Sequence, residues 1–283
     1  MQCEPIMAQK RRLFCEISPT TYYISLQKER LKRWLQNRLS NIRFADVRQA
    51  DHLPVIVASH EGDMIKRGPG IDPQLQSNKA DNIRLACSRI DGVVIRPGET
   101  FSFWHLVGRT SRSNGFAEGR VLVNGRLQAG VGGGLCNLAN TICLVMLHSP
   151  MTIVELHHHS DALAPDPGGI RHPYSAGTSV NYNFIDLRFR NDTQQPVQLR
   201  TWCDGDILRA ELLTTVPFPS TYRLAEEDHH FHLEEDGKFY RRSRIYRETY
   251  DRATGRLIQR ELNWRNHSEV MFDYGLIPKE QIR

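Results

Sequence analysis

Apolar residues recur at the three-to-four spacing of a helix in the segment from Leu138 to Met146. A helix buries such a stripe against a core, and few polar residues interrupt this one. Pro150 cannot continue a helix, so we expect the helix to end near His148. A second stripe in residues 78–90 predicts another helix. The chain is therefore expected to contain at least two core-facing helices.

Shorter apolar segments alternate with polar residues, as strands do. Asn124-Gly125 is the strongest hairpin signal in the chain and would pair residues 119–123 with 126–129. Residues 152–157 predict a strand that runs back towards the start of the 138–148 helix. Further strands are expected at 178–184, 186–190 and 197–203, followed by hairpins from Thr221 onward.

These strands and separate helices together predict an α+β fold. We expect a mixed, mostly antiparallel sheet packed on a central helix that starts at a Gly-Gly-Gly-x-Cys turn, with an N-terminal helical arm and a C-terminal β-hairpin extension. The expected divisions are residues 1–75 for the arm and linker, 76–215 for the core domain and 216–283 for the extension.

Residues 23–44 predict an amphipathic helix with a strongly basic polar side. One interpretation packs its Leu and Trp stripe on the main domain. The other is a peripheral contact with anionic lipid through the Lys and Arg side chains. The formal net charge of +5 is spread over 283 residues, so it does not by itself indicate nucleic acid, and no nucleic-acid partner is expected.

The cysteines and the N-terminus give indications of the cellular compartment in which the protein works. Six cysteines are scattered without a C-x-x-C pair, which argues against a zinc ribbon or a redox motif, and most are expected to be small buried hydrophobes. The first residues lack the basic start and apolar run of a secretory signal. No stretch approaches the roughly 20 apolar residues of a membrane helix. We therefore expect a cytoplasmic protein, with membrane-peripheral contact as the variant.

Candidate chemistry centres on the glycine turn before Cys136. Three consecutive glycines permit a sharp turn that delivers this thiol to the first turn of a helix, where the dipole and unpaired N–H groups favour a thiolate. A cysteine nucleophile with a histidine base is the resulting hypothesis. His159 is the preferred base, with His157 and His158 as alternates. Asp186, or else Asp161, would orient it.

Other residues are predicted to bind the substrate. Backbone N–H groups of Cys136 and Asn137 would stabilise an oxyanion, and Gly133 and Gly134 would shape the pocket. Glu99 is either a turn residue or a pocket acid. Two loop arginines are candidates for a substrate carboxylate, namely Arg109 and Arg171.

Plainer interpretations compete with each of these roles. Cys136 is equally interpretable as a structural thiol in a tightly packed turn, and the histidines as polar strand residues. A metal site is a third hypothesis, with Asp161, His105, His148 or His172 completing the ligands, although adjacent strand residues point to opposite faces. We predict that the protein binds neither a metal ion nor a cofactor.

Several segments, in order, resemble the VanW family. They include Pro97-Gly-Glu-Thr-Phe-Ser-Phe103, the turn Gly132-Gly-Gly-Leu-Cys-Asn137 that opens a helix, and Asp186-Leu-Arg-Phe-Arg-Asn-Asp-Thr193. The resemblance covers residues 78–215 most strongly. Two positions depart from the family pattern: Asn137 stands where the family usually has Gln, and Gly177 where it often has Asp.

This resemblance implies a context of glycopeptide resistance and cell-envelope biology, and leaves open whether the protein is an enzyme. Two classes of function follow. The first is a thiol-dependent peptidase or acyl transferase that acts on peptidoglycan-type peptides. The second is a non-catalytic module that binds a peptide or glycan in a backbone N–H pocket at the glycine turn. A peptide or peptidoglycan precursor is the expected ligand in the first case, and the oligomeric state is left open.

Overall fold

In the computed structural model, the apolar run after the three glycines is a helix, α4 (Leu135–Leu147), and its buried residues contribute to the main hydrophobic core. It ends where Pro150 predicted, with His148 as the C-cap residue. The structure describes residues 13–67, 71–123, 126–162, 165–166 and 177–283. They divide into two compact units, Met1–Asn41 and Ile42–Arg283.

The first unit is a helical arm. After a short 3-10 turn, η1 (Phe14–Glu16), the helix α1 spans Pro19–Leu39. It begins earlier than the apolar pattern predicts because Ser18 accepts the Thr21 N–H and Thr21 in turn caps Ser18. No residue of α1 is buried, and lipid contact along it stays a prediction. Among the described residues, no helix is both long and apolar enough to cross a membrane.

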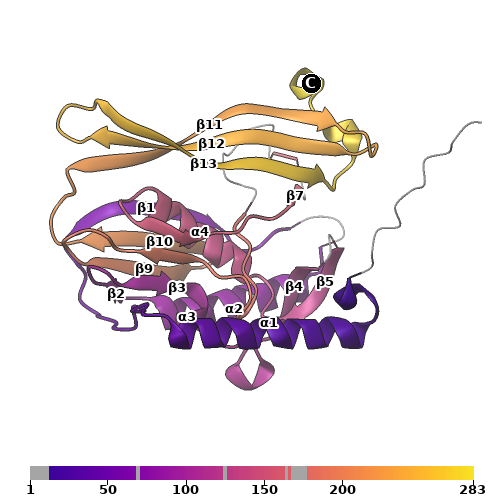
Figure 1. The fold of residues 1–283 in the computed structure, drawn as a ribbon, viewed down its shortest axis with the longest axis horizontal. Coiled ribbons are helices and arrows are strands. Elements are labelled where there is room, and N and C mark those ends of the chain that lie inside the picture. The colour runs from indigo at the N-terminus through magenta and orange to yellow at the C-terminus, as the bar shows by residue number, and fades with distance from the viewer. Residues whose placement is uncertain (1–12, 68–70, 124–125, 163–164, 167–176) are drawn as a thin grey trace, which may run out of the picture. The chain divides into compact units, whose positions relative to one another are not determined.

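The second unit contains a four-stranded antiparallel sheet in the order β1-β10-β9-β2. Its strands are β1 (Val55–Asp63), β10 (Ile207–Thr214), β9 (Val197–Asp204) and β2 (Val93–Ile95). The helix α2 (Pro73–Ile90) packs on β9, and α4 packs on β1 and β10 (Figure 1). α2 starts at Pro73, earlier than predicted, because Asp72 caps it by accepting the N–H groups of Gln74 and Leu75.

A second sheet joins segments that are far apart in the sequence. Its order is β3-β8-β6, with β3 (Thr100–Ser102), β8 (Arg188–Arg190) and β6 (Thr152–Glu155). β3 leads directly into the short helix α3 (Phe103–Val107), followed by η2 (Arg112–Asn114). Two of the motifs singled out from the sequence, at 97–103 and 186–193, therefore pair with each other as antiparallel strands.

The predicted hairpin before the glycine turn is confirmed. β4 (Glu118–Val123) pairs with β5 (Arg126–Val131) in a register that places Val123 opposite Arg126. The turn residues 124–125 lie outside the described part of the chain.

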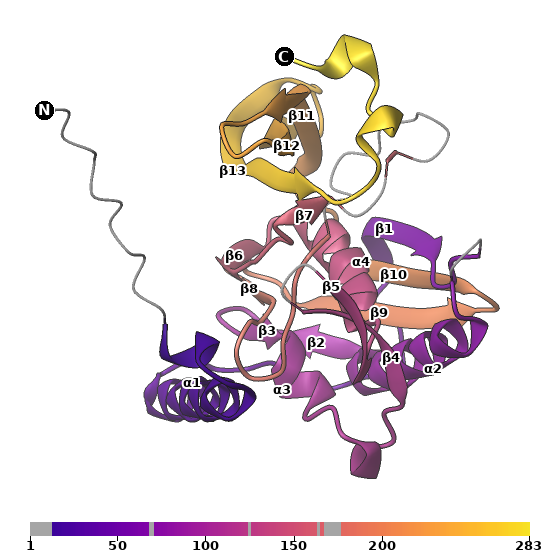
Figure 2. The same cartoon turned by 90° about the vertical axis from the view of Figure 1, so that its right-hand side faces the viewer.

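The C-terminal hairpins form a long sheet in the order β11-β12-β13-β7. β11 (Ser220–Leu233), β12 (Phe239–Asp251) and β13 (Leu257–Val270) are antiparallel, and the short β7 (Asp161–Ala162) joins β13 in parallel. Figures 1 and 2 show these strands side by side, above the layer that holds α4 and β10. Two 3-10 turns follow, η4 (Tyr274–Leu276) and η5 (Lys279–Gln281).

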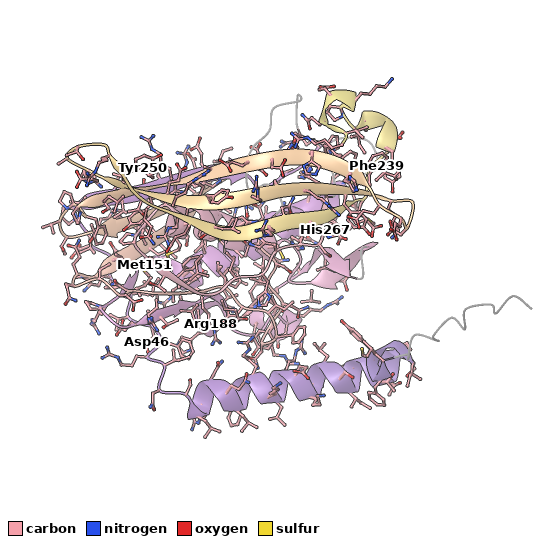
Figure 3. The ribbon with its side chains drawn as sticks, turned by 45° about the horizontal axis from the view of Figure 1, so that its top comes forward. Asp46, Met151, Arg188, Phe239, Tyr250 and His267 are labelled. Atoms are coloured by element: carbon pink, nitrogen blue, oxygen red, sulfur yellow. The ribbon has the colours of Figure 1, made fainter. Side chains whose placement is uncertain are left out.

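A buried arginine links this sheet to the core through hydrogen bonds. Arg247 of β12 donates to the carbonyl oxygens of Ser149 and Met151, which closely follow α4. Its guanidinium also lies over the Tyr222 ring, so the buried charge has an aromatic partner in addition to the two carbonyl oxygens. Figure 3 labels Met151, and also Tyr250 further along β12.

The α+β fold class and the mostly antiparallel pairing are confirmed, although the described strands form several sheets rather than one. The predicted strand at 178–184 is wrong: Thr178 and Asn181 make single bridges, and a turn with Asn183 at φ 50° follows. Side chains of α4 bind part of this backbone instead. The domain boundaries at 75 and 215 remain a prediction.

Candidate functional site

The glycine turn connects β5 to α4 and is held between α2 and the β4–β5 hairpin. Gly132 and Gly134 have φ of +81° and +101°, which L side chains rarely adopt. A Cβ on Gly134 would lie 2.2 Å from Cγ of Lys79 on α2. Gly133 is buried, and its carbonyl oxygen accepts a 3.0 Å hydrogen bond from Asn82 Nδ2. Backbone conformation and close packing therefore require glycine at positions 132 and 134 whether or not a ligand binds.

Cys136 lies at the second position of α4, as predicted, but its environment favours the thiol. Its Sγ is 3.7 Å from the carbonyl oxygen of Val180, to which it donates. Burial raises the pKa of this thiol, and the nearby charge of Lys79 offsets the effect only in part. This raised pKa is the opposite of the lowered pKa that we predicted for Cys136 from its place at the helix N-terminus. The surroundings of Cys136 therefore favour the thiol over the thiolate.

Asn137 uses its hydrogen-bonding groups within the fold. Its backbone N–H donates to Gly134 O at 2.9 Å, so it does not point an unpaired donor at the thiol. Its side-chain amide donates to Asp63 O at the end of β1. The amide that departs from the family pattern at this position thus links α4 to the first sheet.

The segment 177–180 lies against α4 on one edge and the histidines on the other. On the helix side, Thr178 N–H donates to Asn140 Oδ1 at 3.2 Å, and Val180 O accepts from Cys136. On the histidine side, Ser179 N–H donates to His157 O, and His159 N–H donates to Gly177 O. Successive backbone groups of an extended chain point to opposite edges. Cys136 and the backbone of residues 157–159 therefore flank this segment from opposite sides.

The three histidine side chains are in different environments. His158 stacks on Trp264 with ring centroids 4.2 Å apart, and burial lowers its pKa to about 4. Burial also lowers the pKa of His159, opposed by the charge of Asp161. Nε2 of His157 lies 3.2 Å from Oε1 of Glu155. Within the described residues, no histidine is hydrogen-bonded to Cys136.

Asp186 is buried and does not orient a histidine. Its carboxylate accepts from Ser102 Oγ at 2.6 Å, from Arg188 Nε at 2.7 Å, and from the backbone N–H groups of Leu187 and Trp104. These donors come from β3, the first turn of α3 and the entry to β8. Asp186 therefore joins the two paired motifs, with its oxygens fully engaged.

Glu155 and Arg188 extend this cluster and were not singled out from the sequence. Glu155 Oε1 accepts the Asp186 backbone N–H at 2.9 Å, and its Oε2 lies 3.7 Å from Arg188 Nε. Arg188, labelled in Figure 3, is buried and also places its guanidinium over the Phe44 ring. The charged residue inside the 186–193 motif was a usable signal for Arg188. Glu155 had none beyond its position in a strand.

The remaining predicted residues are dispersed. Glu99 accepts the Arg96 N–H at 2.9 Å within its own turn, which matches the turn-residue interpretation. Arg109 is exposed, and its backbone oxygen accepts from Asn114. Arg171 lies outside the described residues. Of the predicted set, the structure gathers Gly133, Gly134, Cys136 and Asn137 at one turn and places Asp186 in a separate network.

A metal ion would need clustered ligating side chains in this region, and a small ligand would need a pocket. Across the part of the chain that the structure describes, no three His, Cys, Asp or Glu side chains cluster so as to hold a metal ion. A pocket of about 340 Å³ opens at the C-terminal end of α4, lined in part by His60, His148, Tyr222 and Arg252. Of the residues named from the sequence, His148, a candidate metal ligand, lines it, whereas the predicted catalytic and substrate-binding residues do not.

Comparisons with known proteins agree with the motifs. Residues 78–213 match a family model described as "VanW like protein". The chain is 27% identical over 220 residues to the "Vancomycin B-type resistance protein VanW" of Enterococcus faecalis (strain ATCC 700802 / V583), covering 78% of this chain and 79% of that protein. It is 32% identical over 123 residues to YoaR of Bacillus subtilis (strain 168), covering 44% of this chain and 39% of that protein. No solved structure matches.

Proposed function

Since this chain belongs to the VanW family, we propose that it works in the cell envelope or in glycopeptide resistance by binding a peptidoglycan-type peptide, without covalent chemistry at Cys136. The observation that carries this proposal is the hydrogen bond from Cys136 to the carbonyl oxygen of Val180. A thiol-dependent enzyme needs a thiolate or a base beside it, whereas this thiol donates to a backbone carbonyl and, within the described residues, has no hydrogen bond to a histidine.

The glycine turn offers groups that suit an anionic end of a peptide. Gly134 and Leu135 open α4, and the first N–H groups of a helix lie at the positive end of its dipole. Lys79 packs on Gly134, and its positive charge is close enough to influence Cys136. A C-terminal carboxylate placed here would meet backbone donors and a cation together. We propose this carboxylate as the group that the turn recognises.

The proposal is tested with a peptidoglycan stem peptide that carries a free C-terminal carboxylate and with the same peptide amidated. We expect amidation to weaken binding about 10-fold or more, because a hydrogen bond to a charged group is worth roughly 1.5–3 kcal/mol. Lys79→Gln keeps the carbons that pack on Gly134 and should weaken binding of the acid to a similar degree. Isothermal titration calorimetry measures both effects.

Arg252→Gln is the matched control, since it removes a cation from the pocket at the other end of α4. Affinity should be unchanged in this variant. Equal binding of acid and amide would contradict recognition of the carboxylate. Weakening by Arg252→Gln but not by Lys79→Gln would move the binding site from the glycine turn to that pocket.

A further inference from the structure

Two cysteines away from the glycine turn lie close together. Cys87 is in the last turns of α2 and Cys203 is near the end of β9, and their Sγ atoms are 4.0 Å apart. A disulfide requires the sulfur atoms to approach to about 2.05 Å. The remaining distance is small for two side chains on elements that already pack against each other.

Other contacts hold these two elements in register. Arg200 of β9 donates to Asp91 at 2.7 Å, directly after α2, and the Thr201 N–H donates to the same carboxylate. Thr201 Oγ1 also donates to the backbone oxygen of Cys87 at 3.3 Å. The backbones that carry the two thiols are therefore positioned by several interactions that do not involve sulfur.

The two thiols differ in a way that assigns their roles. The hydrogen bond between them lowers the pKa of Cys203 and raises that of Cys87, and burial raises the latter further. Arg84, one turn before Cys87 on α2, donates to Gly205 O, and its charge also lowers the pKa of Cys203. Cys203 is half-buried whereas Cys87 is buried. Cys203 is thus the more accessible partner, and the charge of Arg84 favours its thiolate.

We propose that Cys203 and Cys87 form an oxidisable dithiol, which converts to a disulfide between α2 and β9. With a peroxide as oxidant, the Cys203 thiolate attacks one peroxide oxygen. An S–O bond forms, the O–O bond breaks and hydroxide leaves. Cys87 then attacks the sulfur of this sulfenic acid: the S–S bond forms, the S–O bond breaks, and the departing hydroxide takes the Cys87 proton as water. Two thiols lose two electrons and the peroxide gains them.

The test uses the full chain, first reduced with dithiothreitol and freed of it, then exposed to hydrogen peroxide at near-neutral pH. We expect the intact mass to fall by two hydrogen atoms, and non-reducing peptide mapping to show Cys87 linked to Cys203. The Cys136→Ser variant is the matched control and should form the same link. Cys87→Ser should instead retain a Cys203 sulfenic acid that dimedone captures.

Two results would overturn the proposal. One is wild-type protein that keeps both thiols free under conditions that oxidise a small-molecule dithiol. The other is a cross-link that persists in Cys203→Ser and therefore joins different cysteines. Circular dichroism of each variant establishes that it is folded, so that a missing link is not caused by unfolding.

Discussion

Replacement of Asp186 by Asn is expected to destabilise the protein by about 3–5 kcal/mol, the range for breaking a buried ion pair by removing one charge. Asp186 accepts four hydrogen bonds, one of them from the buried Arg188. The amide N–H₂ of Asn would face either this guanidinium or the Ser102 hydroxyl. Within the described part of the chain, Arg188 would then keep the longer 3.7 Å contact with Glu155. Urea denaturation measures the change.

Asp192→Asn is the matched control for this prediction. Asp192 also pairs with an arginine two residues away, with Arg190 Nε at 2.6 Å, but both side chains are exposed. Exposed ion pairs contribute roughly 0–1 kcal/mol, so this variant should unfold close to the wild type. A loss of stability for Asp186→Asn no larger than for Asp192→Asn would show that the buried network does not hold the two motifs together.

Gly134→Ala is expected to have the second largest effect, a loss of roughly 2–5 kcal/mol from backbone strain and overpacking together. Gly134 has a φ of +101°, and its new Cβ would lie 2.2 Å from Cγ of Lys79. This carbon is near the base of the Lys79 side chain, so it moves away only if Lys79 adopts another χ1 rotamer or α2 shifts. Thermal or chemical denaturation gives the magnitude.

A second glycine, Gly205, distinguishes the cost of backbone strain from the cost of the steric clash. Gly205 has a φ of +57°, and no atom lies within 4 Å of the place that an added Cβ would occupy, so Gly205→Ala should cost only the left-handed penalty of about 1–2 kcal/mol. Adding Lys79→Ala to Gly134→Ala removes Cγ and should restore part of the stability. Equal losses for the two single glycine variants would mean that the packing of Lys79 on the turn is not tight.

Local sequence signals predicted the parts of the fold that local physics determines. The spacing from Leu138 to Met146 and the position of Pro150 indicated both the existence and the end of α4. Asn124-Gly125 indicated the register of β4 and β5. The same approach failed at 178–184, because Asn140 and Cys136 of α4 bind backbone groups there that a sheet would otherwise pair.

The chemistry of the site depended on contacts that no local pattern encodes. Cys136 was correctly placed at a helix start, but the segment that buries it is 44 residues away in the sequence. Ser102, which binds Asp186, is 84 residues distant from it. A motif indicates that such residues belong to one structural or functional unit. It does not distinguish a catalytic carboxylate from one that joins two strands.

The central claim, binding without thiol chemistry, is tested most directly by Cys136→Ser with the free-acid stem peptide. We predict that this variant binds the peptide with the affinity of the wild type, and that mass spectrometry finds neither a cleaved or transferred product nor a Cys136 adduct with either protein. Turnover or a covalent adduct in the wild type that disappears in Cys136→Ser would contradict the claim.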